Sequence, residues 1–412
     1  MTFSQACVQW IDNGGVLSAR GFRGVSLRAG IKTEGDDLCL LWSESPATCA
    51  AVFTQNVVKA APVWISAEHA TNDITRAIVC NSGNANCCTG EQGRRDAIAM
   101  CQLASRVLDC QPREVLVCST GIIGHPLPMP QIESALQNVD SSAQFSSEQM
   151  ARAVMTTDLV PKFCAVQFEM DGQTVTIGGQ AKGVGMIGPD MAALQPQGLH
   201  ATMLAFLTTD ARIEKPLLQR ALEEVVARSF NSVTVDGDTS TNDSCILLAN
   251  GASGVEISEI EYSIFVEALQ NVCVELAKKI ARDGEGATKL VQIDVWGAAN
   301  ESDAKTVAMT IATSPLVKTA IFGRDPNWGR IAAAAGRSGV AFNPAKMSIS
   351  IGAVEVFRNG EPTEFDLNTA EEQMSHDDLT ISIQLGVGSA NWTAWTCDFS
   401  YEYVKINAEY HT

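Results

Sequence analysis

The chain has 412 residues, 46% hydrophobic and 18% charged, so it can bury one large or two medium cores and is not a disordered protein. Its formal charge of −18, from 47 acidic and 29 basic residues, argues against nucleic acid or an anionic membrane surface as its main partner. Thirteen cysteines without a Cys-x-x-Cys pair favour reduced thiols, and with no signal peptide or apolar run of about 18 residues we expect a soluble, cytoplasmic protein.

Strands and helices alternate through the first part of the chain. The strands expected there are residues 38–42, 50–53 (with 57–63 as an extension), 76–80, 115–118 and 173–178, and the helices are 93–109 and 146–156. Two of the strands end in polar turns, NSGNAN at 81–86 and STG at 119–121, where Asn and Gly favour an irregular backbone. This alternation predicts a mixed α/β fold with layered sheets and helices.

The second part begins with a glycine-rich turn and an apolar run that Thr202 opens. Beyond it the pattern predicts helices at 215–230 and 261–282, and strands at 245–249, 290–296, 306–312, 347–357, 379–387 and 395–407. A sub-domain boundary near residue 285 fits this pattern, although no change of composition marks it.

The turn Gly183–Gly188 matches the dinucleotide pattern G-x-G-x-x-G letter for letter. That motif needs a helix to open inside it, so that phosphate sits on the helix N-terminus. Here Pro189 and the segment LQPQG at 194–198 cannot continue a regular helix, and Asp210 falls in a helix-like segment rather than at a strand end. A tight turn is the favoured interpretation, and a dinucleotide-binding protein that does not cleave itself is a rival.

The segment VDGDTSTND resembles a cation loop through Asp236, Asp238 and Asp243. A calcium-binding EF-hand would require Glu at its twelfth position, which is Leu247 here, so the calcium interpretation fails. A polar turn that shapes a pocket is favoured, with a magnesium ion on one carboxylate as the open alternative. The five histidines share no metal-ligand spacing, and we predict no metal site.

The histidines also lack the setting of a serine or cysteine hydrolase, so a nucleophilic enzyme would need another base. A threonine at a new N-terminus solves this, because its own α-amine, with a pKa of about 8, can take the hydroxyl proton. Thr202 alone would more simply be a helix N-cap before an apolar run. The motifs around it favour the nucleophile.

Eight motifs follow one another along most of the chain. They are NSGNAN, VCSTGIIG, MTTDLVPK, KGVGMIGPDMA with TMLAFLTTDA, SFNSVTVDGDTSTND, RDGEGATKL, GRDPNWGRI and YVKINAEYHT. Together they resemble the ornithine acetyltransferase family, the glutamate N-acetyltransferases of arginine biosynthesis. The resemblance implies a layered α/β fold that is similar to, but distinct from, that of the N-terminal-nucleophile hydrolases.

The resemblance also implies self-cleavage between Ala201 and Thr202, giving an α-chain (1–201) and a β-chain (202–412) that assemble as a heterotetramer of two α- and two β-chains. Thr202 is the implied nucleophile of a ping-pong acetyl transfer from N-acetylornithine to glutamate. Thr120 and Gly121 would stabilise the oxyanion. The implied substrate contacts are Thr157, Lys182, Thr202, Glu285, Asn407 and Thr412. No cofactor is implied, and acetyl-CoA would be a co-substrate only of a bifunctional enzyme.

One departure from the family pattern is that residues 193–201 stand between Met191-Ala192 and Thr202, where the family reads PDMATML without interruption. Because Ala201 still precedes the threonine, we expect the extension to loop out while Ala201 takes the usual place. The alternative function is a self-processing N-terminal-threonine amidohydrolase or aminopeptidase, which would pass its acyl group to water.

Overall fold

A computed structural model describes residues 8–140, 143–170, 172–192 and 203–409. They fall into two compact units, each described by itself. The first is drawn from Met1–Ala227 and Asp238–Leu276, and the second from Arg228–Gly237 and Ala277–His411. The units divide within helix α6 (Tyr262–Arg282). These units are parts of the fold and not the predicted α- and β-chains, and cleavage between residues 201 and 202 stays a prediction.

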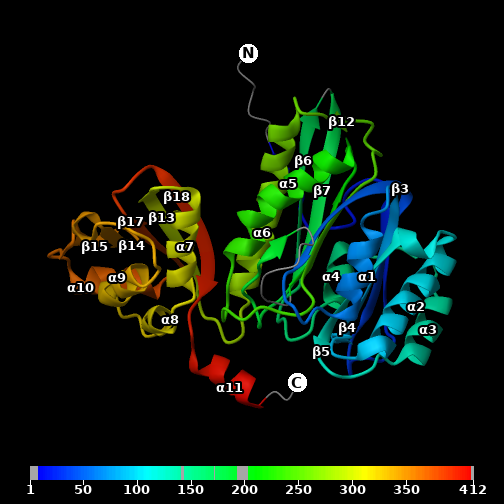
Figure 1. The fold of residues 1–412 in the computed structure, drawn as a ribbon, viewed down its shortest axis with the longest axis horizontal. Coiled ribbons are helices and arrows are strands. Elements are labelled where there is room, and N and C mark those ends of the chain that lie inside the picture. Colours follow the sequence, from blue (N-terminus) through cyan, green and yellow to red (C-terminus); the bar gives the residue numbers. More distant parts are fainter. Residues whose placement is uncertain (1–7, 141–142, 171, 193–202, 410–412) are drawn as a thin grey trace. The chain divides into compact units, whose positions relative to one another are not determined.

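The first unit is built on a ten-stranded mixed sheet in the order β1-β6-β7-β9-β11-β3-β4-β5, with β2 and β8 also paired to β3 (Figure 1). The long strand β3 joins its two halves, because the first half of β3 pairs with β2 and β4 and the second half with β8 and β11. The strands are β1 (Gln9–Trp10), β2 (Phe22–Leu27), β3 (Leu38–Thr54), β4 (Thr75–Asn84), β5 (Val115–Ile122), β6 (Lys162–Met170), β7 (Gln173–Lys182), β8 (Met191–Ala192), β9 (Leu204–Thr209) and β11 (Ser244–Ala249), with a separate parallel pair β10 (Arg212–Ile213) and β12 (Glu256–Ile257).

Helices cover this sheet. They are α1 (Ala61–His69), α2 (Gly90–Leu108), α3 (Met129–Gln137), α4 (Ser147–Ala153), α5 (Lys215–Ala227) and the first part of α6, with a short 3-10 turn η1 (Pro112–Glu114). Helix α6 lies close to β7 at Gly179, where an added Cβ would come within 2.9 Å of Val272 Cγ1. Side chains of α6 such as Phe265 and Leu269 are fully buried, so the predicted amphipathic stripe does pack on the sheet.

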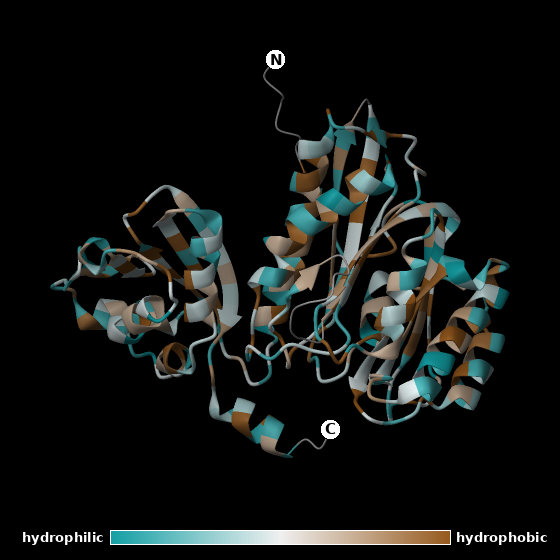
Figure 2. Cartoon of the chain, in the orientation of Figure 1, coloured by the Kyte–Doolittle hydropathy of each residue, from teal (hydrophilic) through white to brown (hydrophobic). Residues whose placement is uncertain are grey.

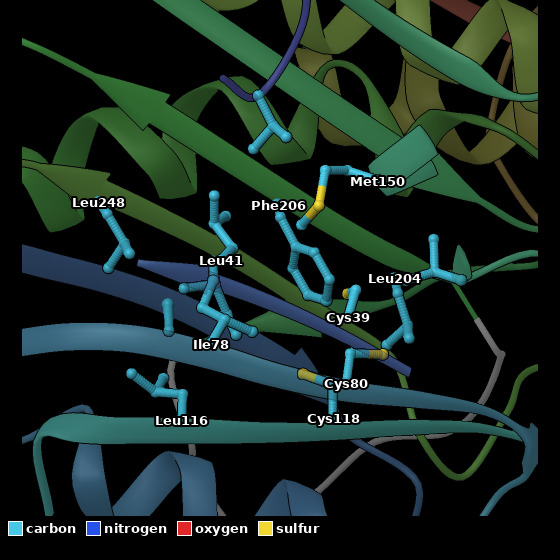
Figure 3. Packing of buried hydrophobic residues seen from close by; sticks show 14 of the residues in the cluster. Cys39, Leu41, Ile78, Cys80, Leu116, Cys118, Met150, Leu204, Phe206 and Leu248 are labelled. Atoms are coloured by element: carbon cyan, nitrogen blue, oxygen red, sulfur yellow. The ribbon is translucent and has the colours of Figure 1, made fainter. Parts of the chain in front are cut away.

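The strands β3, β4 and β5 are buried on both faces. Alternate residues enter two separate hydrophobic clusters: Leu38 and Leu40 lie in one, and Cys39 and Leu41 in the other. Figure 3 shows the second cluster, in which Phe206 of β9 lies among side chains from β3, β4 and β5. Burial of apolar area at about 25 cal/mol per Å² makes this double-sided core the main stabilising contribution. This core holds in place the ends of β4 and β5, which carry the candidate site.

The second unit has a six-stranded sheet in the order β16-β15-β14-β17-β13-β18. Figure 2 shows its apolar residues gathered along the strands and on parts of its helices. Its strands are β13 (Leu290–Ala298), β14 (Ser348–Ile351), β15 (Val354–Arg358), β16 (Glu361–Pro362), β17 (Asp378–Gln384) and β18 (Ala390–Cys397). Its helices are α7 (Glu301–Ala312), α8 (Pro315–Phe322), α9 (Trp328–Gly336), α10 (Leu367–Ser375) and α11 (Tyr401–Glu409), with 3-10 turns η2 (Phe230–Ser232) and η3 (Pro344–Lys346).

The structure confirms the mixed, layered α/β class. It also corrects several local predictions. Residues 57–63 lead into helix α1, because Pro62 fixes its first turn. Residues 306–312 lie in helix α7, which Asn300 caps by accepting the Asp303 N–H. The predicted strand 395–407 ends at Cys397 and is followed by α11. No helix in the described ranges is both long and apolar enough to span a bilayer.

Candidate active site

Most of the two polar turns predicted at strand ends belongs to the strands β4 and β5. β4 continues through Asn84 and β5 through Ile122, and the two run parallel with Ser82 opposite Thr120 and Gly83 opposite Gly121. Gly121 has φ of 132°, and a Cβ there would lie 2.3 Å from the carbonyl carbon of Gly83, so only glycine fits. The expected irregular backbone is confirmed, because the register of the pairing shifts at Gly83 and Asn84 and both Gly83 and Asn86 have positive φ. The pairing holds Thr120 and Gly121 in place.

Lys182, the last residue of β7, joins this region. Its Nζ donates a hydrogen bond to Thr120 Oγ1 at 3.2 Å and another to Thr156 Oγ1 at 2.8 Å. Burial lowers the pKa of Lys182, and the nearby Asp158 carboxylate opposes that shift. The structure thus brings together two residues predicted for the site, Lys182 and Thr120. Thr157 is half-buried, and the hydroxyl of its neighbour Thr156 provides a contact to Lys182.

Asp158 is the buried anion of this cluster. Its Oδ1 accepts from Lys162 Nζ at 2.7 Å and from the Gly183 N–H at 2.8 Å. Its Oδ2 accepts from the Thr156 N–H at 3.1 Å and lies 3.9 Å from Lys182 Nζ. Burial by itself would raise the pKa of this carboxyl, but the charges of Lys182 and Lys162 and these hydrogen bonds bring it well below its usual value. Asp158 therefore stays ionised and ties the glycine turn to both lysines.

The chain directly after Thr202 enters the same region. Lys182 lies opposite Leu204 in the antiparallel pairing of β7 and β9. The Met203 N–H donates to Asp243 Oδ1, and the Met203 carbonyl accepts the Ser244 N–H at 3.0 Å. Next to Asp243, the Asn242 amide donates to the carbonyls of Ala85 and Ser119 at 2.6 and 2.8 Å. The segment 240–244 thus fastens the start of β9 to the strand ends that hold Thr120.

In the second unit, the two predicted contact residues Glu285 and Asn407 lie together. Asn407 Nδ2 donates to Glu285 Oε2 at 3.0 Å and to the Tyr403 carbonyl at 3.0 Å. Glu285 is half-buried and Asn407 is exposed on α11. A carboxylate held in this way can accept a hydrogen bond from an ammonium group.

A model of the ArgJ family matches residues 23–412 of the chain. The chain belongs to the ArgJ family. It is 45% identical over 412 residues to the arginine biosynthesis bifunctional protein ArgJ of Gloeobacter violaceus, covering 98% of this chain and 99% of that protein. It is 42% identical over 417 residues to the protein of the same name from Bacillus thuringiensis, covering 100% of both. A crystal structure of an ornithine acetyltransferase complexed with ornithine, from Mycobacterium tuberculosis, is 38% identical, covering 45% of this chain and 100% of that one with a TM-score of 0.41.

Membership of the ArgJ family confirms the family predicted from the eight motifs, and with it the enzyme class, an acyltransferase of arginine biosynthesis. Three residues predicted for the ArgJ site lie outside the described residues: Ala201, Thr202 and Thr412. The extension 193–201 lies outside them as well. Their roles stay predictions.

The dinucleotide motif has no helix in this ArgJ-family chain. β7 ends at Lys182, and residues 183–192, all described, contain only bends and the short strand β8. The phosphate cradle of a dinucleotide site needs a helix N-terminus there. Asp210 lies directly after strand β9, where its carboxylate accepts from Arg20 Nε at 2.9 Å and from the Thr176 N–H at 2.8 Å. It is therefore a structural residue, and the helix-like assignment of its segment was wrong.

In the part of the chain that the structure describes, no three His, Cys, Asp or Glu side chains gather as they would around an ion. Sequence reasoning missed Thr156, Asp158 and Asn242, all of which lie inside the quoted family motifs. Their proximity to Lys182 and Ser119 follows from the strand order, which the motifs alone do not reveal.

Proposed function

We propose that this ArgJ-family chain is a glutamate N-acetyltransferase that moves the acetyl group of N2-acetyl-L-ornithine to L-glutamate. The chain first cleaves itself between Ala201 and Thr202, and the new N-terminal threonine then carries the acetyl group as an ester. The observation that supports this most directly is the buried contact between Lys182 and Thr120, in a cluster fastened to Met203, the residue after Thr202. An acyl-transfer site needs such a preorganised polar cluster beside its nucleophile.

The acetyl transfer takes place in two half-reactions. The Thr202 hydroxyl oxygen bonds to the acetyl carbon while its proton passes to the α-amine of the same residue. The amide C–N bond of the donor then breaks, and that proton leaves with the ornithine amine. In the second half-reaction the glutamate amine attacks the ester carbon and gives up a proton, the C–O bond to Thr202 breaks, that proton passes to the Thr202 oxygen, and N-acetylglutamate departs.

The hydrogen bond from Lys182 to Thr120 favours an oxyanion role for Thr120. A protonated lysine can only donate, so Thr120 Oγ1 accepts from it and keeps its own hydroxyl hydrogen for another acceptor. The lysine charge also polarises that hydroxyl and makes it a stronger donor. Together with the Gly121 N–H, Thr120 can stabilise the charge that develops on the acetyl oxygen.

We assign the substrate contacts that the family resemblance implies, namely Thr157, Lys182, Glu285, Asn407 and Thr412. We further propose acetyl-CoA as a second acetyl donor, which the name "bifunctional" of the relatives supports. We infer an assembly of two α- and two β-chains in the cytoplasm. A reducing compartment suits the twelve described cysteines, all of which are free thiols.

The experiment that tests the proposal gives the purified chain N-acetylornithine together with glutamate and measures all products. We expect N-acetylglutamate and ornithine in equal amounts. Release of acetate without N-acetylglutamate would instead identify the amidohydrolase alternative.

Replacing Thr120 with valine should lower kcat about 10²- to 10³-fold, the usual effect of losing one oxyanion donor. Valine keeps the volume of this fully buried side chain and removes only the hydroxyl. Steady-state kinetics should show KM little changed, and Thr120→Ser should retain most activity. A valine variant with wild-type kcat would remove Thr120 from the oxyanion site.

Replacing Glu285 with glutamine should raise KM for N-acetylornithine about 10- to 100-fold, because an ammonium group would lose its charged acceptor. The side-chain oxygen that accepts from Asn407 is kept, so the change isolates the charge. The matched control is Glu409→Gln on α11, an exposed carboxylate that should leave KM unchanged. Equal KM values for wild type and Glu285→Gln would exclude the proposed contact.

A further inference from the structure

Asp243 is a fully buried carboxylate that the reaction described above does not use. One oxygen, Oδ1, accepts the N–H of Met203. The other, Oδ2, is buried and has no hydrogen-bond partner among the described residues. A buried carboxylate oxygen without a donor costs free energy, so such an oxygen in a well-packed site calls for an explanation.

The backbone holds Asp243 firmly. Its carbonyl accepts the Thr54 N–H at 2.9 Å, and the following residue, Ser244, begins β11, which runs parallel to β9. The backbone is therefore fixed, and the side chain could turn to another partner only by breaking the hydrogen bond from the Met203 N–H. The N–H that Oδ1 accepts belongs to Met203, the residue that directly follows the predicted nucleophile Thr202. Asp243 therefore holds the chain at the position next to the nucleophile.

The charge around Asp243 favours a cationic or amine donor. Burial raises the pKa of Asp243 well above its usual value; the Met203 N–H, the charge of Lys182 and the Ser240 hydroxyl oppose that shift without cancelling it. A further donor at Oδ2 would stabilise the ionised form. An amine suits this position, because a carboxylate beside an amine stabilises the ammonium that forms when the amine takes up a proton.

We propose that Asp243 is a positioning residue of the acyl-transfer site, whose Oδ1 anchors Met203 and whose Oδ2 receives an amine group when the site is working. The proposal rests on the proposed function. The amine has two sources, the α-amine that cleavage creates on the chain and the amino group of the substrate. In both cases the carboxylate orients the amine and compensates its charge, as the aspartate of a catalytic triad does for its histidine.

The test compares Asp243→Asn with wild type. Asparagine keeps an oxygen for the Met203 N–H but presents hydrogens where Oδ2 was, so it repels an amine donor. We expect complete self-cleavage by intact-mass spectrometry and a kcat for acetyl transfer lowered about 10- to 100-fold. Asp243→Ser, whose hydroxyl is too short to reach Met203, should lose both cleavage and transfer. Thermal unfolding of both variants reports whether they fold.

The matched control is Asp210→Asn. Asp210 is also a fully buried aspartate, at the opposite end of β9, and its oxygens are occupied by Arg20 and Thr176. This variant should unfold at a lower temperature and yet keep the wild-type kcat. Such a result would separate the effect of Asp243 from general destabilisation.

An amine-free acetyl ester as donor distinguishes the two sources. If the amine belongs to the chain, Asp243→Asn slows acetylation of the enzyme by the ester as well as by N-acetylornithine. If it belongs to the substrate, acetylation by the ester keeps its wild-type rate and only the reactions of N-acetylornithine and glutamate slow.

Wild-type kcat and KM in Asp243→Asn would overturn the proposal. A folded Asp243→Asn variant that fails to cleave would also overturn it, because the α-amine of Thr202 does not exist before cleavage and Oδ2 would then have another role. Normal cleavage and transfer in Asp243→Ser would overturn the role of Oδ1. A wild-type chain that neither cleaves nor transfers would instead refute the proposed function.

Discussion

Replacing Thr202 with alanine should abolish both self-cleavage and acetyl transfer. Alanine has no hydroxyl to attack the Ala201 carbonyl or the acetyl carbon, and losing a covalent nucleophile lowers kcat by a factor on the order of 10⁴ or more. A denaturing gel should show one band in place of two, and the transfer assay should show no N-acetylglutamate above background.

Two variants serve as controls for this result. Thr202→Ser keeps a hydroxyl and should cleave and transfer at a reduced rate. Thr208→Ala removes a buried hydroxyl of strand β9, one that donates to the Val16 carbonyl at 2.8 Å, and should cleave normally. A cleaved, active Thr202→Ala chain would show that the nucleophile lies elsewhere.

Replacing Asp158 with alanine should lower the free energy of unfolding by about 3–5 kcal/mol. The change would leave Lys162 and Lys182 buried without the carboxylate that they share. Urea unfolding at neutral pH measures the loss. The surface pair of Arg152 and Glu148 offers a control, since Glu148→Ala should cost less than about 1 kcal/mol.

The pH dependence of the Asp158 effect has a definite sign. The pKa of Asp158 is lower in the folded chain than its usual value. Its contribution is therefore fully present above the unfolded pKa, and it is lost as the pH falls toward the lowered folded pKa. The difference in unfolding free energy between wild type and Asp158→Ala should shrink in acid. A constant difference from neutral to acid pH would contradict the assigned ion pairs.

Some of the fold could be predicted from sequence because its signals are local. The helix at 215–230 and the long helix at 261–282 carry apolar stripes at helical spacing, and both exist as α5 and α6. The segment 306–312 misled because its β-branched residues favour a strand, whereas packing against β13 and β18 makes it helix α7. The apolar run after Thr202 is strand β9 and not a helix, because it pairs with β7 and β11.

For the candidate site, too, the sequence identifies some residues and not others. Thr120, Gly121 and Lys182 could be named because they lie in recognisable motifs. Asp158 and Asp243 lie in such motifs as well, but the motifs do not show the contacts that make them important, because those contacts join segments that are distant in the sequence. Asn242 contacts Ser119, a residue 123 positions away. No pattern in a single sequence reports a contact of that range.

Mass spectrometry of the denatured enzyme after incubation with N-acetylornithine alone should detect an acetyl group on Thr202, the covalent intermediate of the proposed reaction. Without glutamate the second half-reaction cannot proceed, so the acetyl-enzyme should accumulate. We expect two fragments, residues 1–201 and 202–412, with the mass of one acetyl group added to the second and located on Thr202. An uncut chain, or fragments that never gain the acetyl group while N-acetylglutamate still forms in the complete reaction, would contradict the proposed reaction.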